Sequence, residues 1–174
     1  EAYAQIEMRR RLTLIGAMMV RKGDADAMIC GTYGTHDMHL KYIDQVLGLR
    51  KGAHEYAAMN GLMLPGRLLF LVDTHVNYDP TAEQIAEITV MAAEELQRFG
   101  IEPKVALLSH SNFGTSNTPS AVKMRDALEI IRKRAPKLEV DGEMHGDSAL
   151  DEDMRAGLVD SHLSGSANLL VFPN

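Results

Sequence analysis

The stretch LLSHSNFGTSNTPSAVKMRDALEIIRKRAP, residues 107–136, decides the fold because it joins a strand, a polar turn and a helix. The apolar run KVALLS, residues 104–109, predicts a buried strand. Thr118 followed by Pro119 is typical of a helix start, with a capping residue before a proline at the first helical position. The inner face of that helix is expected to comprise Ala121, Met124, Leu128, Ile131 and Ala135. A strand that runs into a crossover helix of this length is the unit of a mostly parallel sheet.

The N-terminal third predicts two helices around one short strand. The first helix is expected to carry an apolar face of Met8, Leu12, Ile15 and Met19. Gly23 follows that face as a helix stop, and residues 24–31, DADAMICG, predict a short apolar strand. Asp37 is expected to cap the second helix, which Gly48 ends.

The middle of the chain predicts a hairpin and a long helix. Residues 57–76 contain two apolar runs split by LPGR, which is typical of an antiparallel hairpin. Thr81 and Gln84 have the spacing of a capping box, and Gly100 ends the helix that follows. The apolar stripe of this helix is expected to comprise Ile85, Ile88, Ala92, Leu96 and Phe99.

The C-terminal part predicts a strand followed by a turn in residues 138–144, a short helix in residues 148–159 and a last strand in residues 168–173. The whole pattern predicts an α/β domain over residues 1–174, with a mostly parallel sheet, flanking helices and a β-hairpin. A buried parallel strand usually runs on into a crossover helix, and the first residues already read as helix without an initiator methionine. We therefore expect a fragment of a longer polypeptide, incomplete at both ends.

Composition and charge exclude several classes of protein. The 174 residues have a formal net charge of −6, and no lysine or arginine block exceeds Arg9–Arg11, which argues against a nucleic-acid partner. No apolar run approaches the roughly 20 residues that a membrane helix needs. The single cysteine, Cys30, excludes an internal disulfide framework. These observations predict a cytoplasmic protein.

Three polar turns follow predicted strands, at the edge where parallel sheets bind ligands. They are GTYGTHD after residue 30, SHSNFGTSNTP after residue 108 and DGEMHGD after residue 140. The second turn has the composition of an anion cradle, because a glycine allows close backbone approach, hydroxyls donate and a helix N-terminus supplies free N–H groups. The alternative is that Thr118 simply caps the helix and the rest is a polar surface loop.

Other candidate motifs have weaker support. Ser120 and Lys123 match the S-x-x-K pattern of acyl-serine enzymes, but no K-T-G follows, which favours chance. His36 and His39 could ligate a metal from one helix face, but no third ligand has suitable spacing, so we predict no metal site. In the third turn, every second residue is acidic or histidine: Asp141, Glu143, His145 and Asp147. These side chains could hold a cation or orient a substrate, or the acidic ones could cap the next helix.

The ordered set of motifs resembles the phosphate acetyltransferase/butyryltransferase family over nearly the whole chain. The matching motifs are GDADAMICG, PTAEQIAEI, FGIEPKVALLSHSNFG, KLEVDGEMHGDSAL and LSGSANLLVFPN. Within the family, SHSNFG and DGEMHGDSAL are most similar to the domain that forms the C-terminal half of bacterial NADP-dependent malic enzymes. The resemblance implies a two-subdomain α/β fold like that of the isocitrate dehydrogenase group, in a dimer or larger assembly.

Two departures from the family pattern concern catalysis. The family's Ser-Arg pair and nearby aspartate lie in a segment after the strand that ends this chain at Asn174, so we predict no catalytic residues within it. Lys41 stands where the family has an arginine, and a lysine lacks the bidentate fork that grips a phosphoryl group.

The resemblance supports two readings of function. In the first, the chain is a regulatory and oligomerisation domain that binds acetyl-CoA, within a polypeptide that decarboxylates malate to pyruvate with NADP and Mg²⁺ or Mn²⁺. In the second, it is an active transferase that moves an acyl group between an acyl phosphate and CoA. A pure dimerisation module is a third option. The predicted ligand pocket is lined by Ser109, Ser111, Asn112, Gly114, Thr115, Lys41, Asp141 and Glu143.

Overall fold

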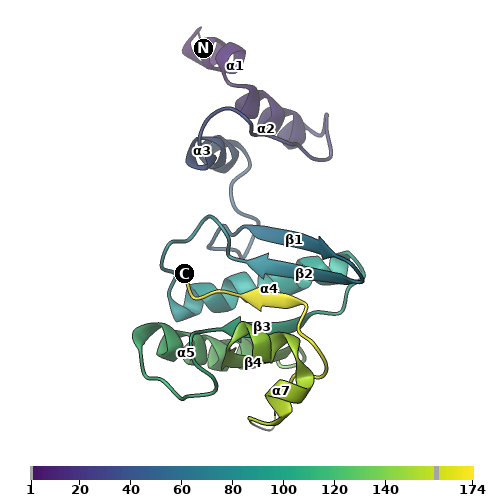
Figure 1. Cartoon of the computed structure of the whole chain (residues 1–174). Helices are drawn as coiled ribbons and strands as arrows, with labels where there is room; N and C mark the ends of the chain where they lie inside the picture. Colours follow the sequence, from purple (N-terminus) through teal and green to yellow (C-terminus); the bar gives the residue numbers. More distant parts are fainter. Residues whose placement is uncertain (1, 159–160) are drawn as a thin grey trace. The chain divides into compact units, whose positions relative to one another are not determined.

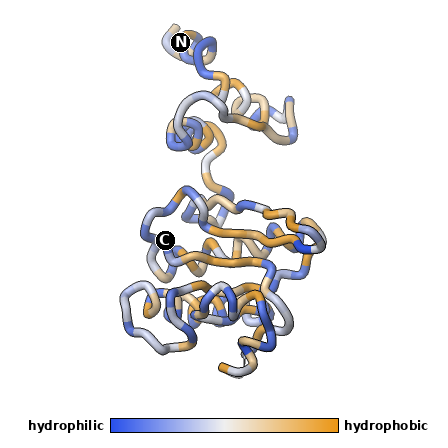
Figure 2. The backbone as a smooth tube through the Cα atoms, viewed as in Figure 1, coloured by the Kyte–Doolittle hydropathy of each residue, from blue (hydrophilic) through white to orange (hydrophobic). Residues whose placement is uncertain are grey.

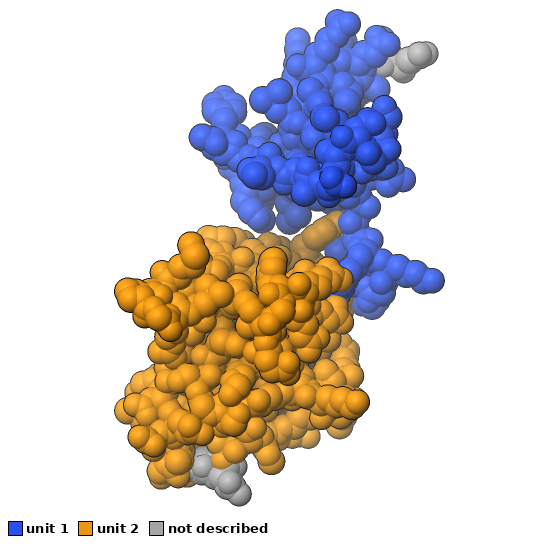
Figure 3. All heavy atoms as spheres, turned by 90° about the vertical axis from the view of Figure 1, so that its right-hand side faces the viewer, with its two compact units in different colours: residues 1–54 blue, residues 55–174 orange. Residues whose placement is uncertain are grey.

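The structure is a computed structural model that describes residues 2–158 and 161–174. The chain divides into two compact units, residues 1–54 and residues 55–174, which Figure 3 colours separately. Each unit has its own secondary structure and is described by itself.

Unit 1 is helical within its described residues. Its helices are α1 (Ala2–Arg10), α2 (Leu12–Lys22) and α3 (His36–Val46). The prediction of one continuous first helix is wrong, because Arg11 has extended backbone angles that separate α1 from α2. Gly23 ends α2 with a positive φ of 77°, as the sequence predicts.

The short strand expected at residues 24–31 is absent, and this prediction is wrong. Among the described residues, the five-stranded sheet contains no segment of unit 1. The side chain of Ile29, in the middle of the expected strand, is fully exposed. Alternating burial and ladder hydrogen bonds stabilise a strand, and this segment has neither.

The start of α3 lies slightly upstream of the prediction. The capping residue is Thr35 rather than Asp37, because the Thr35 hydroxyl accepts a hydrogen bond from the Met38 N–H at 3.3 Å. Asp37 lies in the first turn instead, where a carboxylate favours the helix dipole. Gly48 follows the helix with a φ of 70°, which confirms the predicted stop.

Unit 2 is an α/β unit (Figure 1). Its elements are β1 (Met59–Leu64), β2 (Arg67–Val72), α4 (Ala82–Arg98), β3 (Lys104–Leu108), α5 (Pro119–Arg134), β4 (Glu139–Met144), α6 (Gly146–Leu150), α7 (Glu152–Ala156) and β5 (Leu169–Val171). The strands form one sheet in the order β1-β2-β5-β3-β4. Only the β1–β2 hairpin is antiparallel among these pairs, and it turns at Pro65–Gly66, so the mostly parallel sheet and the hairpin are both confirmed.

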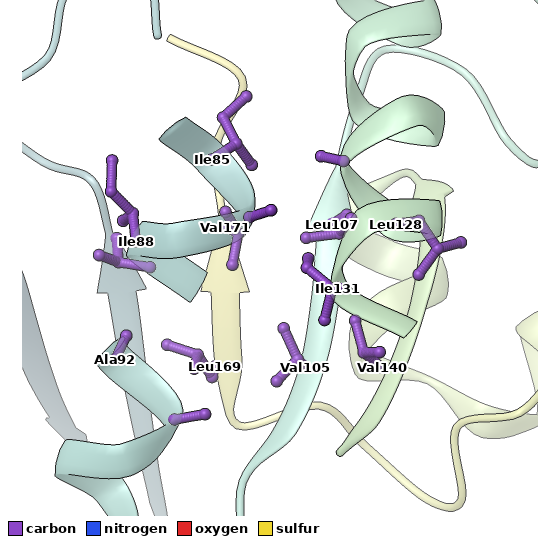
Figure 4. Close-up of a cluster of buried hydrophobic side chains, with 14 of the residues drawn as sticks. Ile85, Ile88, Ala92, Val105, Leu107, Leu128, Ile131, Val140, Leu169 and Val171 are labelled. Carbon is purple, nitrogen blue, oxygen red and sulfur yellow. The ribbon is translucent and has the colours of Figure 1, made fainter. Parts of the chain in front are cut away.

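Two apolar clusters hold the sheet between layers. Figure 2 shows hydrophobic residues concentrated along the strands of unit 2. On one face, α4 and α5 pack side by side against the sheet, as the labelled side chains of Figure 4 show. The cluster there includes Ile85, Ile88, Leu128, Ile131, Val105, Leu107, Val140, Leu169 and Val171. On the other face, a smaller cluster joins strand residues to α6 and the segment before β5; it comprises Ala106, Leu108, Met144, Ala149, Leu163, Ala167 and Leu170.

The long helix α4 has the predicted start and stop. Thr81 and Gln84 form the expected capping box, and Gly100 has a φ of 74° just after the helix. The predicted apolar stripe is buried except for Phe99, which is 68% exposed. Phe99 occupies the C-cap position with non-helical backbone angles, so it no longer follows the face of the helix.

Strand β4 differs from the prediction in a way that matters for the site. Residues 141–144 continue the strand instead of forming a turn. Leu107 pairs with Gly142 and Leu108 pairs with Met144, so Glu143 is an extra residue opposite β3. This is a β-bulge, which typically redirects a side chain near a ligand site. The short helix predicted at residues 148–159 is two helices, α6 and α7, and Val159 lies outside the described residues.

Candidate functional site

The carboxyl ends of β2, β5, β3 and β4 meet at one edge of the sheet, because these four strands are parallel. In open α/β sheets, ligands bind at this edge. Residues 109–118, here called the β3–α5 loop, leave the edge from β3 and lead into α5. The bulge residue Glu143 lies at the end of the neighbouring strand β4.

Glu143 ties the β3–α5 loop to the sheet. Its side chain is fully buried, and its Oε1 atom accepts hydrogen bonds from the Ser111 hydroxyl at 2.6 Å and the Gly114 N–H at 3.0 Å. The Glu143 carbonyl also accepts the Phe113 N–H at 2.7 Å. Its Oε2 atom is buried and has no hydrogen-bond partner among the described residues. Unpaired buried polar atoms are rare in proteins, and they concentrate at functional sites.

Arg125 of α5 adds a cation to the same loop. Its Nη1 atom lies 3.3 Å from Glu143 Oε1 and donates to the Ser116 carbonyl at 2.9 Å. Its Nη2 atom donates to the Asn117 side chain at 2.9 Å. Arg125 is not among the residues that the sequence predicts for the site. The available signal is its position four residues after Ala121, which lies on the predicted inner face of the helix.

The N-terminus of α5 is open toward the loop. Thr118 occupies the N-cap position, but its side chain makes no capping hydrogen bond to the helix. Its hydroxyl instead lies 3.0 Å from Nε2 of His110. The expectation that Thr118 caps the helix with its side chain is therefore wrong. The first backbone N–H groups of α5 remain without that side-chain acceptor, which is the arrangement that favours a bound anion.

The structure brings together the predicted residues of the loop and Glu143. Ser109 and Asn112 bond to the end of β4: the Ser109 N–H donates to the Met144 carbonyl at 2.9 Å, and the Asn112 Oδ1 atom accepts from the His145 N–H at 2.8 Å. Thr115 closes the loop on itself, because its hydroxyl accepts the Asn112 N–H at 3.2 Å. Gly114, with a φ of 85°, provides the left-handed turn between them.

Asp141 makes contacts away from the loop, although it is also buried. Its carboxylate accepts hydrogen bonds from Arg132 at 3.2 Å, from the Ser161 hydroxyl at 2.7 Å and from the His162 N–H at 2.8 Å. These contacts fix the segment that leads to β5. Lys41 lies on α3 in unit 1, so its part in the site stays a prediction.

Asp73 follows β2 at the same sheet edge and is also absent from the residues that the sequence predicts for the site. Burial raises the pKa of Asp73, but hydrogen bonds from the Ala58, His75 and Asn77 N–H groups and from the Asn77 side chain outweigh burial. The net effect lowers the pKa of Asp73 below its ordinary value. The signal in the sequence is an aspartate directly after an apolar run and before a polar turn.

The weaker motifs have structural roles. Lys123 pairs with Asp79 at 2.5 Å rather than with Ser120. His39 joins three segments of unit 1: its Nδ1 atom lies 2.6 Å from the Thr13 hydroxyl and its Nε2 atom 3.0 Å from the Tyr33 carbonyl. Across residues 2–158 and 161–174, no three histidine, cysteine or acidic side chains gather in a way that could hold a metal ion. Within the same ranges, every helix is too short or too polar to cross a membrane.

The fold defines an α/β protein with a polar loop at the sheet edge where such folds bind ligands, and comparison with known proteins identifies the family. The family model described as phosphate acetyl/butaryl transferase matches residues 1–174. The chain belongs to this family.

Similar proteins fall into two groups. The NADP-dependent malic enzyme of Escherichia coli is 59% identical over 163 residues, which are 93% of this chain and 22% of that enzyme. The phosphate acetyltransferase of Corynebacterium glutamicum is 36% identical over 169 residues, which are 97% of this chain and 51% of that enzyme. A phosphotransacetylase structure from Streptococcus pyogenes superimposes with a TM-score of 0.87 at 33% identity, covering 97% of this chain and 52% of that one. The chain thus spans between about a fifth and a half of these relatives.

Proposed function

We propose that the chain is an acetyl-CoA-binding regulatory and oligomerisation domain of a malic enzyme polypeptide. The parent reaction would be the oxidative decarboxylation of malate to pyruvate, with NADP and Mg²⁺ or Mn²⁺ held by residues outside this chain. The similarity to malic enzymes over 93% of the chain supports the parentage. The observation that carries the binding function is the β3–α5 loop, fastened by Glu143 beside an open helix N-terminus.

The loop has the chemistry that a phosphorylated ligand such as acetyl-CoA needs. The chain is net negative overall, so an anion requires local compensation rather than a general attractive field. The N–H groups at the start of α5 and the guanidinium of Arg125 supply it at the loop, and the ammonium of Lys41 is the third candidate. The buried contacts of Glu143 keep the loop preorganised, which reduces the entropic cost of binding.

Calorimetric titration with acetyl-CoA tests this proposal. Valine at Gly114 should place a branched side chain where the ligand approaches, and Lys41→Ala should remove a charge while leaving the loop intact. Each charge-assisted hydrogen bond contributes about 1.5–3 kcal/mol, so either variant should bind about tenfold to a hundredfold more weakly. In the polypeptide that carries a malic enzyme domain, both should relieve inhibition by acetyl-CoA and leave effector-free malate turnover nearly unchanged.

Gly100→Val is the matched control for Gly114→Val. Both glycines have a positive φ, 74° and 85°, and an added Cβ at either would meet no atom within 4 Å. Backbone strain should therefore destabilise both variants similarly, while only the change at Gly114 should weaken binding. Unchanged acetyl-CoA affinity in both Gly114→Val and Lys41→Ala would contradict the assignment of the loop.

The second candidate is an active acyltransferase that moves an acyl group between an acyl phosphate and CoA. It is favoured by the phosphate acetyltransferases that match 97% of the chain. Both functions use the same loop, so ligand binding does not separate them. Formation of acetyl-CoA from acetyl phosphate by the longer polypeptide separates them: efficient turnover would support the transferase and overturn the regulatory proposal.

A further inference from the structure

We propose a second binding site, in unit 2, for a small amino acid with an aliphatic body. The site is a pocket of about 460 Å³ between the second half of α4, the loop before β3 and the turn from α5 to β4. This volume is within the range of small-ligand pockets, roughly 300–1,000 Å³. The loop and the turn each precede a strand, and the two strands are parallel, so the pocket lies at the opposite edge of the sheet from the β3–α5 loop. The inference goes beyond the function proposed for that loop.

The apolar part of the pocket is continuous with the hydrophobic core. Its apolar lining comprises Val90, Ala93, Ala135, Pro136 and Leu138. Ala93 belongs to the cluster under α4 and α5, and Val90 and Leu138 pack against that cluster. An aliphatic ligand group at this wall would leave water and contact core side chains, which is favourable in proportion to the apolar area it buries.

The charged lining residues are divided by sign between the two sides of the pocket. Glu94 and Gln97 lie on α4, and Glu102 follows in the loop before β3. Arg134 ends α5, and Lys137 lies in the turn that follows. An acidic side and a basic side together match a zwitterion, because each ligand charge then meets lining groups of opposite sign.

The basic side is open to a ligand carboxylate. Within residues 2–158 and 161–174, neither Arg134 nor Lys137 makes an ion pair or a side-chain hydrogen bond. Arg132, two residues before Arg134, is instead engaged by Glu129 and Asp141. A guanidinium can bind both oxygens of a carboxylate at once, so Arg134 and Lys137 provide the contacts that the acid group of an amino acid needs.

Hydrogen bonds hold both sides of the pocket in place. The Asn168 side chain donates to the Glu102 carbonyl at 2.8 Å, which fixes the loop before β3. In the turn after α5, the Leu138 N–H donates to the Ala135 carbonyl at 3.0 Å. A pocket whose backbone is already fixed loses less entropy when a ligand enters.

A titration followed by proton–nitrogen correlation spectra of the whole chain tests the site, because it measures both affinity and location. Leucine and ε-aminocaproate are the two ligands; caproate lacks the ammonium, hexylamine lacks the carboxylate and glycine lacks the aliphatic body. We expect saturable shifts of the Gln97, Lys137 and Leu138 amide signals with the two ligands, and a half-saturation concentration about threefold higher or more with each analogue. Tighter binding of leucine indicates an α-amino acid, and tighter binding of ε-aminocaproate indicates a ligand with separated charges; either result supports the site.

Charge-neutralising variants test each side of the pocket. Lys137→Gln and Glu102→Gln should each raise the half-saturation concentration of the tighter ligand about threefold or more. Lys133→Gln and Glu83→Gln make the same changes at exposed residues outside the lining and should leave it nearly unchanged. Lys137→Gln should also narrow the difference between that ligand and hexylamine, because the ligand carboxylate has lost a partner.

Three outcomes would overturn the proposal: no saturable shift with either ligand, equal half-saturation with any of the three analogues, or half-saturation that is unchanged in both Lys137→Gln and Glu102→Gln. The Gly114→Val variant separates this proposal from the previous one. It should leave the amino acid titration unchanged, because the pocket and the β3–α5 loop lie at opposite edges of the sheet.

Discussion

The buried carboxylate of Glu143 makes more contacts with the β3–α5 loop than the sequence alone indicates. One oxygen accepts from Ser111, Gly114 and Arg125, so the loop conformation depends on this side chain. Glu143→Gln keeps the shape and one acceptor oxygen but removes the charge that faces Arg125. We expect a loss of stability of about 1–3 kcal/mol, and faster hydrogen exchange of the Gly114 amide.

Urea unfolding and amide hydrogen exchange, measured for Glu143→Gln and for the unchanged protein, test this expectation. Glu83→Gln is the control, since Glu83 is exposed in the first turn of α4. If Gly114 exchanges at the same rate in Glu143→Gln as in the unchanged protein, Glu143 does not hold the loop.

Asp73 should make stability depend on pH. Its pKa in the folded chain is lowered from the ordinary value of 3.8, so it contributes stability above that value and loses it as the pH falls through the folded pKa. Asp73→Asn should therefore lower the free energy of unfolding at pH 7, and the difference from the unchanged protein should shrink toward pH 3. Urea titrations at both pH values measure it.

Asp126→Asn serves as the matched control for Asp73. Asp126 is an exposed aspartate on α5. Its replacement should change the free energy of unfolding little at either pH. A stability difference for Asp73→Asn that stays constant between pH 7 and pH 3 would disagree with the lowered pKa.

At the scale of elements, the pairing of β3 with β4 leaves no room for a side chain at Gly142. A Cβ atom there would lie 2.6 Å from the Leu107 carbonyl oxygen, and the φ of 145° is strained for any other residue. Gly142→Ala should destabilise the chain by about 1–3 kcal/mol, as measured by urea unfolding. Gly146→Ala, at the first position of α6 with no atom within 4 Å, should be close to neutral or stabilising. Equal stability of the two variants would show that β3 and β4 separate more easily than their packing indicates.

Elements whose local signals agree with their environment are predictable from sequence. The capping box of α4, the Pro65–Gly66 hairpin and the proline start of α5 all appear where local chemistry places them. The prediction of a strand at residues 24–31 is wrong, because a strand needs a neighbouring strand to pair with, and the local sequence does not reveal whether one is present. The turn predicted after residue 140 is wrong, because Gly142 allows close packing of β4 against Leu107 and the strand continues.

At the scale of the whole molecule, the sequence predicts the β3–α5 loop as the candidate site but does not predict the contacts that support this loop. The serines, Asn112 and Gly114 follow from composition and from their place after a strand. Arg125 does not, because its contacts with Ser116 and Glu143 join residues 9 and 18 positions apart in the chain. Asp73 does not either, because its carboxylate accepts from Ala58, 15 positions away, as well as from the nearby His75 and Asn77. Asp141 and Glu143 are two residues apart and would share a face in a regular strand, so only the bulge explains their different partners.

The bulge in β4 also changes what a mutational scan of this strand would reveal. Val140 packs with the α4 and α5 side of the sheet, whereas Met144, which has the same parity in the sequence, packs on the opposite side. Residues 140–144 are buried on both faces of the sheet, so a substitution should disturb the two clusters in turn up to Gly142, and this alternation should then change phase. Among relatives, a gap of one residue at Glu143 would exchange the two faces of the strand end, even where every remaining residue is identical.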